Sequence, residues 1–237
     1  MVEAIYLDNM FDSEFKASVQ SIDEGKYVVL DRTAFYPNSG GVAHDTGTLR
    51  RDRDGEAFRV VFTGKFGGTI SHEVDRPGLE AGDRVTGALD WERRYTLMRY
   101  HTAAHVISGT FWKEGGVKIS GNQLDVDGGR MDFTLEDFDK GKIEGFVQRA
   151  NEVVEADLPV DVYYIDREKL NDDPDLVKLA AGFPKDIERI RIVDIRGFDR
   201  QPDGGCHVRS TGEIGRIELT KTKNKGKNNR RMYFSLG

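Results

Sequence analysis

The feature that most constrains the fold is an abrupt change in residue pattern at Asp90. Before it, short runs of β-branched and aromatic residues, such as 58–63, alternate with glycine and aspartate. This pattern is typical of a small β-barrel or sandwich. After Asp90, which can cap a helix, apolar residues recur at helical spacing as far as Lys113, and Gly115 and Gly116 follow. The chain is therefore predicted to fold as an α+β protein in two parts.

The domain boundary is predicted at this change. It gives a β-barrel-like domain over 1–90 and, over 91–237, a two-layer domain of helices on an antiparallel sheet. Strands in the first domain are expected at 27–30, 47–49, 58–63, 69–74 and 84–89. The second domain is expected to contain helices at 91–113, 135–156 and 176–181, and strands at 117–120, 130–133, 160–165, 190–195, 214–220 and 232–236.

Composition points to a reducing compartment. The 237 residues contain no apolar run that approaches the ~20 residues of a membrane span. The first residues are acidic and mixed, unlike the basic start and apolar core of a secretory signal. Cys206 is the one cysteine, which excludes an internal disulfide. We therefore expect a cytoplasmic protein with no membrane contact.

Three of the five histidines lie in two short segments far apart in the sequence. His101 and His105 are spaced to share one face of the predicted helix. The second segment places Asp203, Cys206 and His207 around two glycines that allow a tight turn. Imidazole, carboxylate and thiolate are all zinc ligands. A zinc site is therefore predicted; the alternative is a pair of structural histidines and a β-turn.

Charge is distributed unevenly along the chain. The net charge is −6, yet the segment 216–231 carries seven basic residues against one acidic residue. A basic strip on an acidic protein can bind a polyanion at one place while the remainder repels it. The strip is therefore a predicted nucleic-acid contact, and a solvated turn between two strands is the alternative.

A third segment, Thr-Ala-Phe-Tyr-Pro followed by a pair of glycines, by itself predicts only a turn between strands. Together, the three segments resemble, in order and spacing, the AlaX proteins, free-standing relatives of the alanyl-tRNA synthetase editing domain. The matching positions are Thr33, Phe35, Tyr36, Pro37, Gly40, Gly41, His101, His105, Gly204, Gly205 and His207, with further similarity at 93–99, 210–215 and 221–231.

The resemblance implies one Zn²⁺ ion per chain. Its ligands would be His101, His105, His207 and Asp203, which stands where the family has a cysteine. Cys206 is the alternative fourth ligand, but Asp203 keeps the family's spacing. A carboxylate in place of a thiolate should leave the zinc a stronger Lewis acid.

The resemblance also implies which residues meet the substrate. Thr33 is the expected catalytic-site residue, as the reader of a serine hydroxyl, and Gly40, Gly41 and Arg99 are expected to bind substrate. Val42 stands where the family has glutamine, which removes a polar group beside the site. The residues expected to meet tRNA phosphates are Arg93, Arg94, Arg99, Arg216, Lys221, Lys223, Lys225, Lys227, Arg230 and Arg231.

The implied activity is hydrolysis, in trans, of the ester that joins serine, or glycine, to the terminal adenosine of tRNA(Ala). Zinc could activate water or orient the substrate, and a site that hydrogen-bonds the serine hydroxyl can reject alanine. The expected partner is the acceptor end of tRNA(Ala), bound by a monomer or weak dimer. Val42 and Asp203 favour an alternative, a tRNA-binding module whose zinc is structural. A zinc hydrolase acting on a small ester is a third hypothesis.

Overall fold

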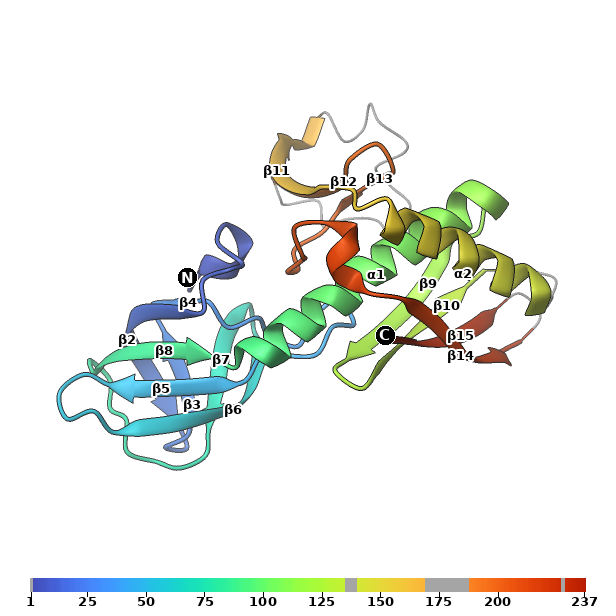
Figure 1. The fold of residues 1–237 in the computed structure, drawn as a ribbon. Helices are drawn as coiled ribbons and strands as arrows, with labels where there is room; N and C mark the ends of the chain where they lie inside the picture. The colour runs from blue at the N-terminus through green and yellow to red at the C-terminus, as the bar shows by residue number, and fades with distance from the viewer. Residues whose placement is uncertain (1, 135–139, 169–187, 227–228) are drawn as a thin grey trace. The chain divides into compact units, whose positions relative to one another are not determined.

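The computed structural model describes residues 2–134, 140–168, 188–226 and 229–237. The chain divides into two compact units, Met1–Leu97 and Met98–Gly237 (Figure 1). The division falls inside helix α1 (Trp91–Gly115). The predicted start of the second helix at 135 and the predicted helix at 176–181 lie outside the described residues.

The first unit contains a closed antiparallel barrel, in line with the predicted run of short strands. Its strands are β2 (Glu14–Asp23), β3 (Tyr27–Leu30), β5 (Gly47–Arg51), β6 (Ala57–Phe66), β7 (Thr69–Val74) and β8 (Arg84–Leu89). They neighbour one another in the order β2-β3-β7-β6-β5-β8. A short helix, η1 (Ile5–Leu7), follows β1 (Glu3–Ala4), which pairs in parallel with β4 (Arg32–Thr33). The bounds of β3, β7 and β8 are those predicted, whereas β2 was not predicted.

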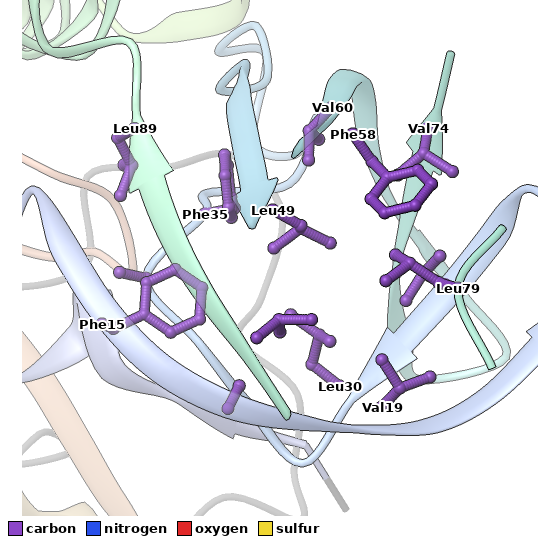
Figure 2. Close-up of a cluster of buried hydrophobic side chains, with 14 of the residues drawn as sticks. Phe15, Val19, Leu30, Phe35, Leu49, Phe58, Val60, Val74, Leu79 and Leu89 are labelled. Atoms are coloured by element: carbon purple, nitrogen blue, oxygen red, sulfur yellow. The ribbon is translucent and has the colours of Figure 1, made fainter. Parts of the chain in front are cut away.

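The barrel builds its core by alternation along its strands. In β2, Phe15, Ala17 and Val19 are buried and the residues between them are more exposed, because successive side chains of a strand point to opposite faces. Figure 2 shows side chains from the other strands converging on the same interior. Phe35, which follows β4, packs edge to face against Phe15 with ring centroids 5.7 Å apart. The first unit therefore has a hydrophobic core of its own.

Helix α1 begins behind Asp90, as predicted, because the Asp90 Oδ1 atom accepts a hydrogen bond from the Arg93 N–H group at 3.2 Å. Residues 100–111 are all buried. The sequence indicated burial of one broad face, but small residues let other elements approach from the remaining sides. Gly109, for example, lies against the ring of Phe198. The middle of α1 is thus an internal helix.

The second unit contains a four-stranded antiparallel sheet in the order β14-β15-β10-β9. Its strands are β9 (Ile119–Asp125), β10 (Gly128–Phe133), β14 (Ile217–Asn224) and β15 (Arg230–Leu236). The Phe133 ring stacks on Phe111 of α1 with centroids 4.2 Å apart, and Phe111 contacts Phe146 of α2 (Lys140–Glu155) at 4.8 Å. Helices therefore cover one face of this sheet, as the predicted two-layer domain requires.

The second unit also contains a three-stranded sheet, which is followed by the loop that carries Asp203 and His207. Its antiparallel strands are β11 (Val160–Asp166), β12 (Arg189–Ile195) and β13 (Asp199–Pro202), with β12 in the middle. The short helix η3 (Thr211–Ile214) follows, with a capping box between Ser210 and Glu213. In the part of the chain that the structure describes, no helix is both long and apolar enough to cross a membrane.

Candidate metal centre

The four side chains predicted as zinc ligands lie together in the second unit. Helix α1 contributes His101 and His105, and the loop after β13 contributes Asp203 and His207. One donor atom from each residue lies within 4.8 Å of the other three. The rings of His101 and His207 are stacked with centroids 4.2 Å apart. The helical spacing thus brings two imidazoles to one face, and the glycine loop brings a third imidazole and a carboxylate to them.

Asp203 contacts all three imidazoles. Its Oδ2 atom is 3.5 Å from Nε2 of His101 and 3.9 Å from Nε2 of His105, and its Oδ1 atom is 3.1 Å from Nε2 of His207. Burial by itself raises the pKa of Asp203, but the charge of His101 and hydrogen bonds from the three rings hold that pKa well below its usual value. Burial, and then the charge of His101, lowers the pKa of His207 well below its usual value. An ionised Asp203 and a neutral His207 are the forms that bind metals.

The loop that carries Asp203 is fixed by backbone contacts. The Gly205 N–H group donates to Oδ1 of Asp203 at 2.6 Å, and Nη1 of Arg191 in β12 donates to the carbonyl oxygens of Asp203 and Gly205, both at 2.9 Å. Gly205 also lies so close to the His101 ring that a Cβ atom would overlap it. Glycine is needed here for this close approach. The sequence predicted the turn but carried no sign of Arg191.

Thr102 is another site residue that the sequence analysis missed. Its side chain is completely buried. Its hydroxyl donates to the Met98 carbonyl oxygen at 2.9 Å and lies 3.2 Å from Nδ1 of His207. This contact joins residues 105 positions apart, so no local pattern could have revealed it.

The donor set fits a zinc ion. Nε2 of each of the three histidines lies within 3.9 Å of a carboxylate oxygen of Asp203, so the four donor atoms surround one point. Three imidazoles and a carboxylate are zinc ligands, and the donors of a tetrahedral zinc lie roughly 3–4 Å apart. The four residues could hold such an ion with small movements. Cys206 is buried, but the group of possible ligands among the described residues contains Asp203 and not Cys206.

Gly40 and Gly41 form a tight turn in the first unit. Their φ angles are +59° and +79°, and the backbones of Ser39 and Val42 exchange hydrogen bonds on either side of them. Two successive positive φ angles are typical of a type I′ turn, which favours glycine. The side chain of Val42, where the resemblance leads one to expect a glutamine, is buried.

Thr33 has a defined hydrogen-bond network inside the first unit. Its side chain is fully buried, and its Oγ1 atom lies 2.9 Å from Nε2 of His72 and accepts the Phe35 N–H group at 3.1 Å. Nδ1 of His72 faces the Val28 carbonyl oxygen at 3.0 Å, so Nδ1 carries the ring hydrogen. Nε2 therefore accepts the hydroxyl hydrogen of Thr33. The Thr33 oxygen can act only as an acceptor toward any further group.

Arg94, expected at tRNA phosphates, is instead a core residue of the first unit. Its guanidinium is 1% exposed and forms an ion pair with Asp45, which is equally buried. It also donates to the Ala34 carbonyl oxygen at 2.5 Å. A side chain held in this way is not on the surface where phosphates bind.

Arg93 and Arg99, also expected at tRNA, make contacts within the protein. Nε of Arg93 donates to the His44 carbonyl oxygen at 2.9 Å. In the second unit, Arg99 donates to the carbonyl oxygens of Ile214 at 3.0 Å and Gly237 at 2.9 Å. Both side chains remain partly exposed, so their predicted roles in tRNA and substrate binding stay predictions.

The predicted basic strip follows the hairpin of β14 and β15. Lys221, Lys223 and Lys225 are exposed, whereas Lys227 lies outside the described residues. Arg230 is buried. Arg231 forms a two-point ion pair with Asp132 at 2.6 and 2.7 Å. The lysines of the strip are therefore more available to a polyanion than its last two arginines.

The register of the sheet adds residues to this surface. Lys221 lies opposite Tyr233, which lies opposite Arg130, while Lys223 lies opposite Arg231. Residues that face each other across a ladder share one side of the sheet. This side, which we call the basic sheet face, therefore presents Lys221, Lys223, Arg130, Arg231 and Tyr233, together with Asp132 opposite Arg231.

Comparisons with known proteins identify the families that the chain resembles. Residues 2–93 match the family described as tRNA synthetases class II (A), and residues 190–233 match the family described as threonyl and alanyl tRNA synthetase second additional domain. The second match includes Asp203 and His207.

Full-length relatives define the family more closely. The chain is 48% identical to the alanyl-tRNA editing protein AlaX-M of Methanosarcina mazei, a match that covers 100% of this chain and 97% of the relative. It is 40% identical to the protein of the same name in Saccharolobus solfataricus, over 100% of this chain and 99% of the relative. It is also 36% identical to the alanine–tRNA ligase of Pyrococcus furiosus, where the match covers 98% of this chain and 26% of the ligase. Because identity at this level extends over the whole length of both chains, the chain belongs to the AlaX-M family of alanyl-tRNA editing proteins.

Proposed function

We propose that this protein is a zinc-dependent deacylase that hydrolyses the ester between serine, or glycine, and the terminal adenosine of tRNA(Ala). Its full-length relatives are named alanyl-tRNA editing proteins, which supports editing of this tRNA. The observation that carries the chemistry is the cluster of His101, His105, Asp203 and His207, with donor atoms within 4.8 Å of one another.

Each residue of the cluster has a part in this proposal. His101 and His105 offer nitrogens from helix α1, while Asp203 and His207 complete the donor set from the loop. The low pKa of Asp203 supplies a negative charge at neutral pH, and the low pKa of His207 leaves that ring neutral. When bound, zinc would supply a Lewis acid for ester hydrolysis.

Thr33 is proposed to read the serine hydroxyl. Because its own hydrogen is directed to His72, it would accept a hydrogen bond from the substrate and would not donate one. Alanine has no hydroxyl to donate, and a site built around such a bond rejects the analogue that lacks it. Gly40, Gly41 and Arg99 are proposed to contact the rest of the aminoacyl end.

The basic sheet face is proposed to contact the tRNA backbone. Lys221 and Lys223 supply exposed positive charge, and Tyr233, which is partly exposed, lies on β15 between Lys221 of β14 and Arg130 of β10. Arg231 adds little net positive charge to this face because it is paired with the carboxylate of Asp132. Lys227 remains a predicted contact on the sequence alone.

The test is deacylation of serine-charged tRNA(Ala), with and without a chelator and with zinc restored. We expect the wild type to deacylate, the chelated protein to stop, and the His101→Ala, His105→Ala double variant to be inactive. His44→Ala, a histidine outside the cluster, is the matched control and should retain activity. Full turnover in the double variant would overturn the proposal.

Two outcomes would identify the other hypotheses. Tight binding of tRNA(Ala) without deacylation would show a binding module with a structural zinc. Hydrolysis of a small ester that is insensitive to competing tRNA would show a small-ester hydrolase.

A further inference from the structure

In all three histidines of the cluster, Nε2 faces Asp203 and Nδ1 is the outer nitrogen. His207 differs from the other two in what surrounds this Nδ1 atom. Nδ1 of His101 and Nδ1 of His105 have no partner among the described residues, whereas Nδ1 of His207 lies 3.2 Å from the hydroxyl oxygen of Thr102. Both His207 and Thr102 are completely buried. Thr102 therefore contacts one nitrogen of the His207 ring, and Asp203 contacts the other.

The hydrogen bonds of Thr102 define what its oxygen can offer. A hydroxyl group has one hydrogen and two lone pairs. The hydrogen goes to the Met98 carbonyl oxygen at 2.9 Å, and one lone pair accepts the Val208 N–H group at 3.2 Å. The remaining lone pair faces His207, so Thr102 can accept a hydrogen from Nδ1 of that ring.

The direction of this bond decides which nitrogen of His207 can serve the cluster. A neutral imidazole has one hydrogen, and the nitrogen without it carries the lone pair. If Nδ1 donates to Thr102, the lone pair is on Nε2, the atom that faces Asp203 at 3.1 Å. Ligating histidines generally need such an outer partner to fix the ring and its hydrogen.

We propose that Thr102 is a positioning residue for the metal centre, which holds His207 in the form with hydrogen on Nδ1 and a lone pair on Nε2. Thr102 also anchors the backbone just beyond the ligand through Val208. One side chain therefore sets both the ring hydrogen and the place of the loop. The inference rests on the proposed zinc site and goes beyond it, because it concerns a residue that does not touch the metal.

The structure supplies a matched control in the same helix. Thr110 is buried in α1 and its hydroxyl donates to the Val106 carbonyl oxygen at 2.8 Å, the same bond that Thr102 makes to Met98. In the part of the chain that the structure describes, the Thr110 hydroxyl has this one hydrogen bond and none to the cluster. The single variants Thr102→Val and Thr110→Val each remove a hydroxyl from the helix. Only Thr102→Val also removes the contact with His207, so a comparison of the two isolates that contact.

The test measures zinc affinity by competition with a chromogenic chelator, in folded variants checked by circular dichroism. Thr102→Val should weaken zinc binding by about 10–100-fold. Thr102→Ser, which retains the hydroxyl, and Thr110→Val should stay within a few-fold of wild type. Equal affinity in Thr102→Val and wild type would overturn the inference.

A second measurement needs no variant. In the zinc-loaded wild type, long-range ¹H–¹⁵N correlation of the histidine rings should show the His207 hydrogen on Nδ1; hydrogen on Nε2 would overturn the inference. Zinc binding without deacylation of serine-charged tRNA(Ala) would overturn the proposed function and leave the role of Thr102 intact. A wild type that binds no zinc would overturn both.

Discussion

Arg94 and Asp45 form an ion pair in which each side chain is 1% exposed. Asp45 also accepts the Tyr36 N–H group at 2.6 Å, so the pair ties the start of α1 to the segment after β4 inside the first unit. Replacing Arg94 with methionine leaves a buried carboxylate without its cation. We expect Arg94→Met to lower the free energy of unfolding of the first unit by about 3–5 kcal/mol.

Trp91 and Trp112 make this prediction measurable, because one lies in each unit. Urea unfolding followed by Trp91 fluorescence in a Trp112→Phe background reports on the first unit. Arg32→Met removes an exposed pair with Glu3 and should change little, since surface ion pairs are weak. Similar losses in both variants would contradict the prediction.

His72 should make the first unit less stable in mild acid. Burial lowers the pKa of His72 from 6.5 to about 4. Between these values the unfolded chain binds a proton that the folded chain does not, so stability falls as the pH falls. The free energy of unfolding should therefore fall by about 2 kcal/mol between pH 7 and pH 5 because of His72. Unfolding at the two pH values should show a smaller loss in His72→Gln; an equal loss in both proteins would count against a neutral, buried His72.

Gly205→Ala should damage the metal centre without a change of ligand. The new Cβ atom would overlap the His101 ring and crowd Oδ1 of Asp203, so these two ligands could not keep their present positions. We expect zinc affinity to fall by about tenfold or more, by analogy with the loss of other residues that orient ligands. Gly145→Ala in α2, where a Cβ meets nothing within 4 Å, is the control. Unchanged affinity in Gly205→Ala would show that the His101 ring is not held in this place.

Cobalt can distinguish Asp203 from Cys206 as the fourth ligand. Cobalt-loaded wild type should lack the near-ultraviolet charge-transfer band of a thiolate, because a carboxylate completes the cluster. Asp203→Cys should gain the band, and Cys206→Ser should leave the wild-type spectrum unchanged. A band in wild type that disappears in Cys206→Ser would identify the cysteine as the ligand.

The basic sheet face should determine how salt affects tRNA binding. Lys221→Gln with Lys223→Gln should weaken binding and reduce the slope of log affinity against log salt by about one for each phosphate that the variant no longer neutralises. Lys16→Gln with Lys65→Gln removes two exposed lysines of the first unit and serves as the control. Equal effects of the two pairs would exclude the basic sheet face as the tRNA-binding surface.

Local patterns were sufficient to predict most of the fold. Alternation and turn residues placed β7 and β8 at their observed bounds, and Asp90 placed the start of α1. β2 was missed although Phe15, Ala17 and Val19 alternate, because small and polar residues occupy much of its length. β13 was also missed, since its polar sequence is held as a strand by pairing with β12.

In the candidate site, too, local patterns predicted some residues and not others. Helical spacing and a glycine turn predicted a zinc site at His101, His105 and the segment of Asp203, Cys206 and His207, because these signals lie within short segments. The choice of Asp203 over Cys206 came from the family resemblance. Thr102 and Arg191 act through contacts with residues distant in the sequence, which no local pattern contains. Arg94 was expected at phosphates for the same reason: its charge is visible in the sequence, whereas its partner Asp45 is not adjacent to it.

The metal centre also has a mechanical consequence. His105 and Asp203 belong to α1 and to the loop after β13, so an ion bound to both would close a loop of roughly a hundred residues, the length over which a disulfide restricts an unfolded chain strongly. With one cysteine, the chain has no covalent crosslink of that kind. Bound zinc would act as a reversible crosslink in place of a disulfide. When the ion is scarce, the second unit would then lose stability as well as its Lewis acid.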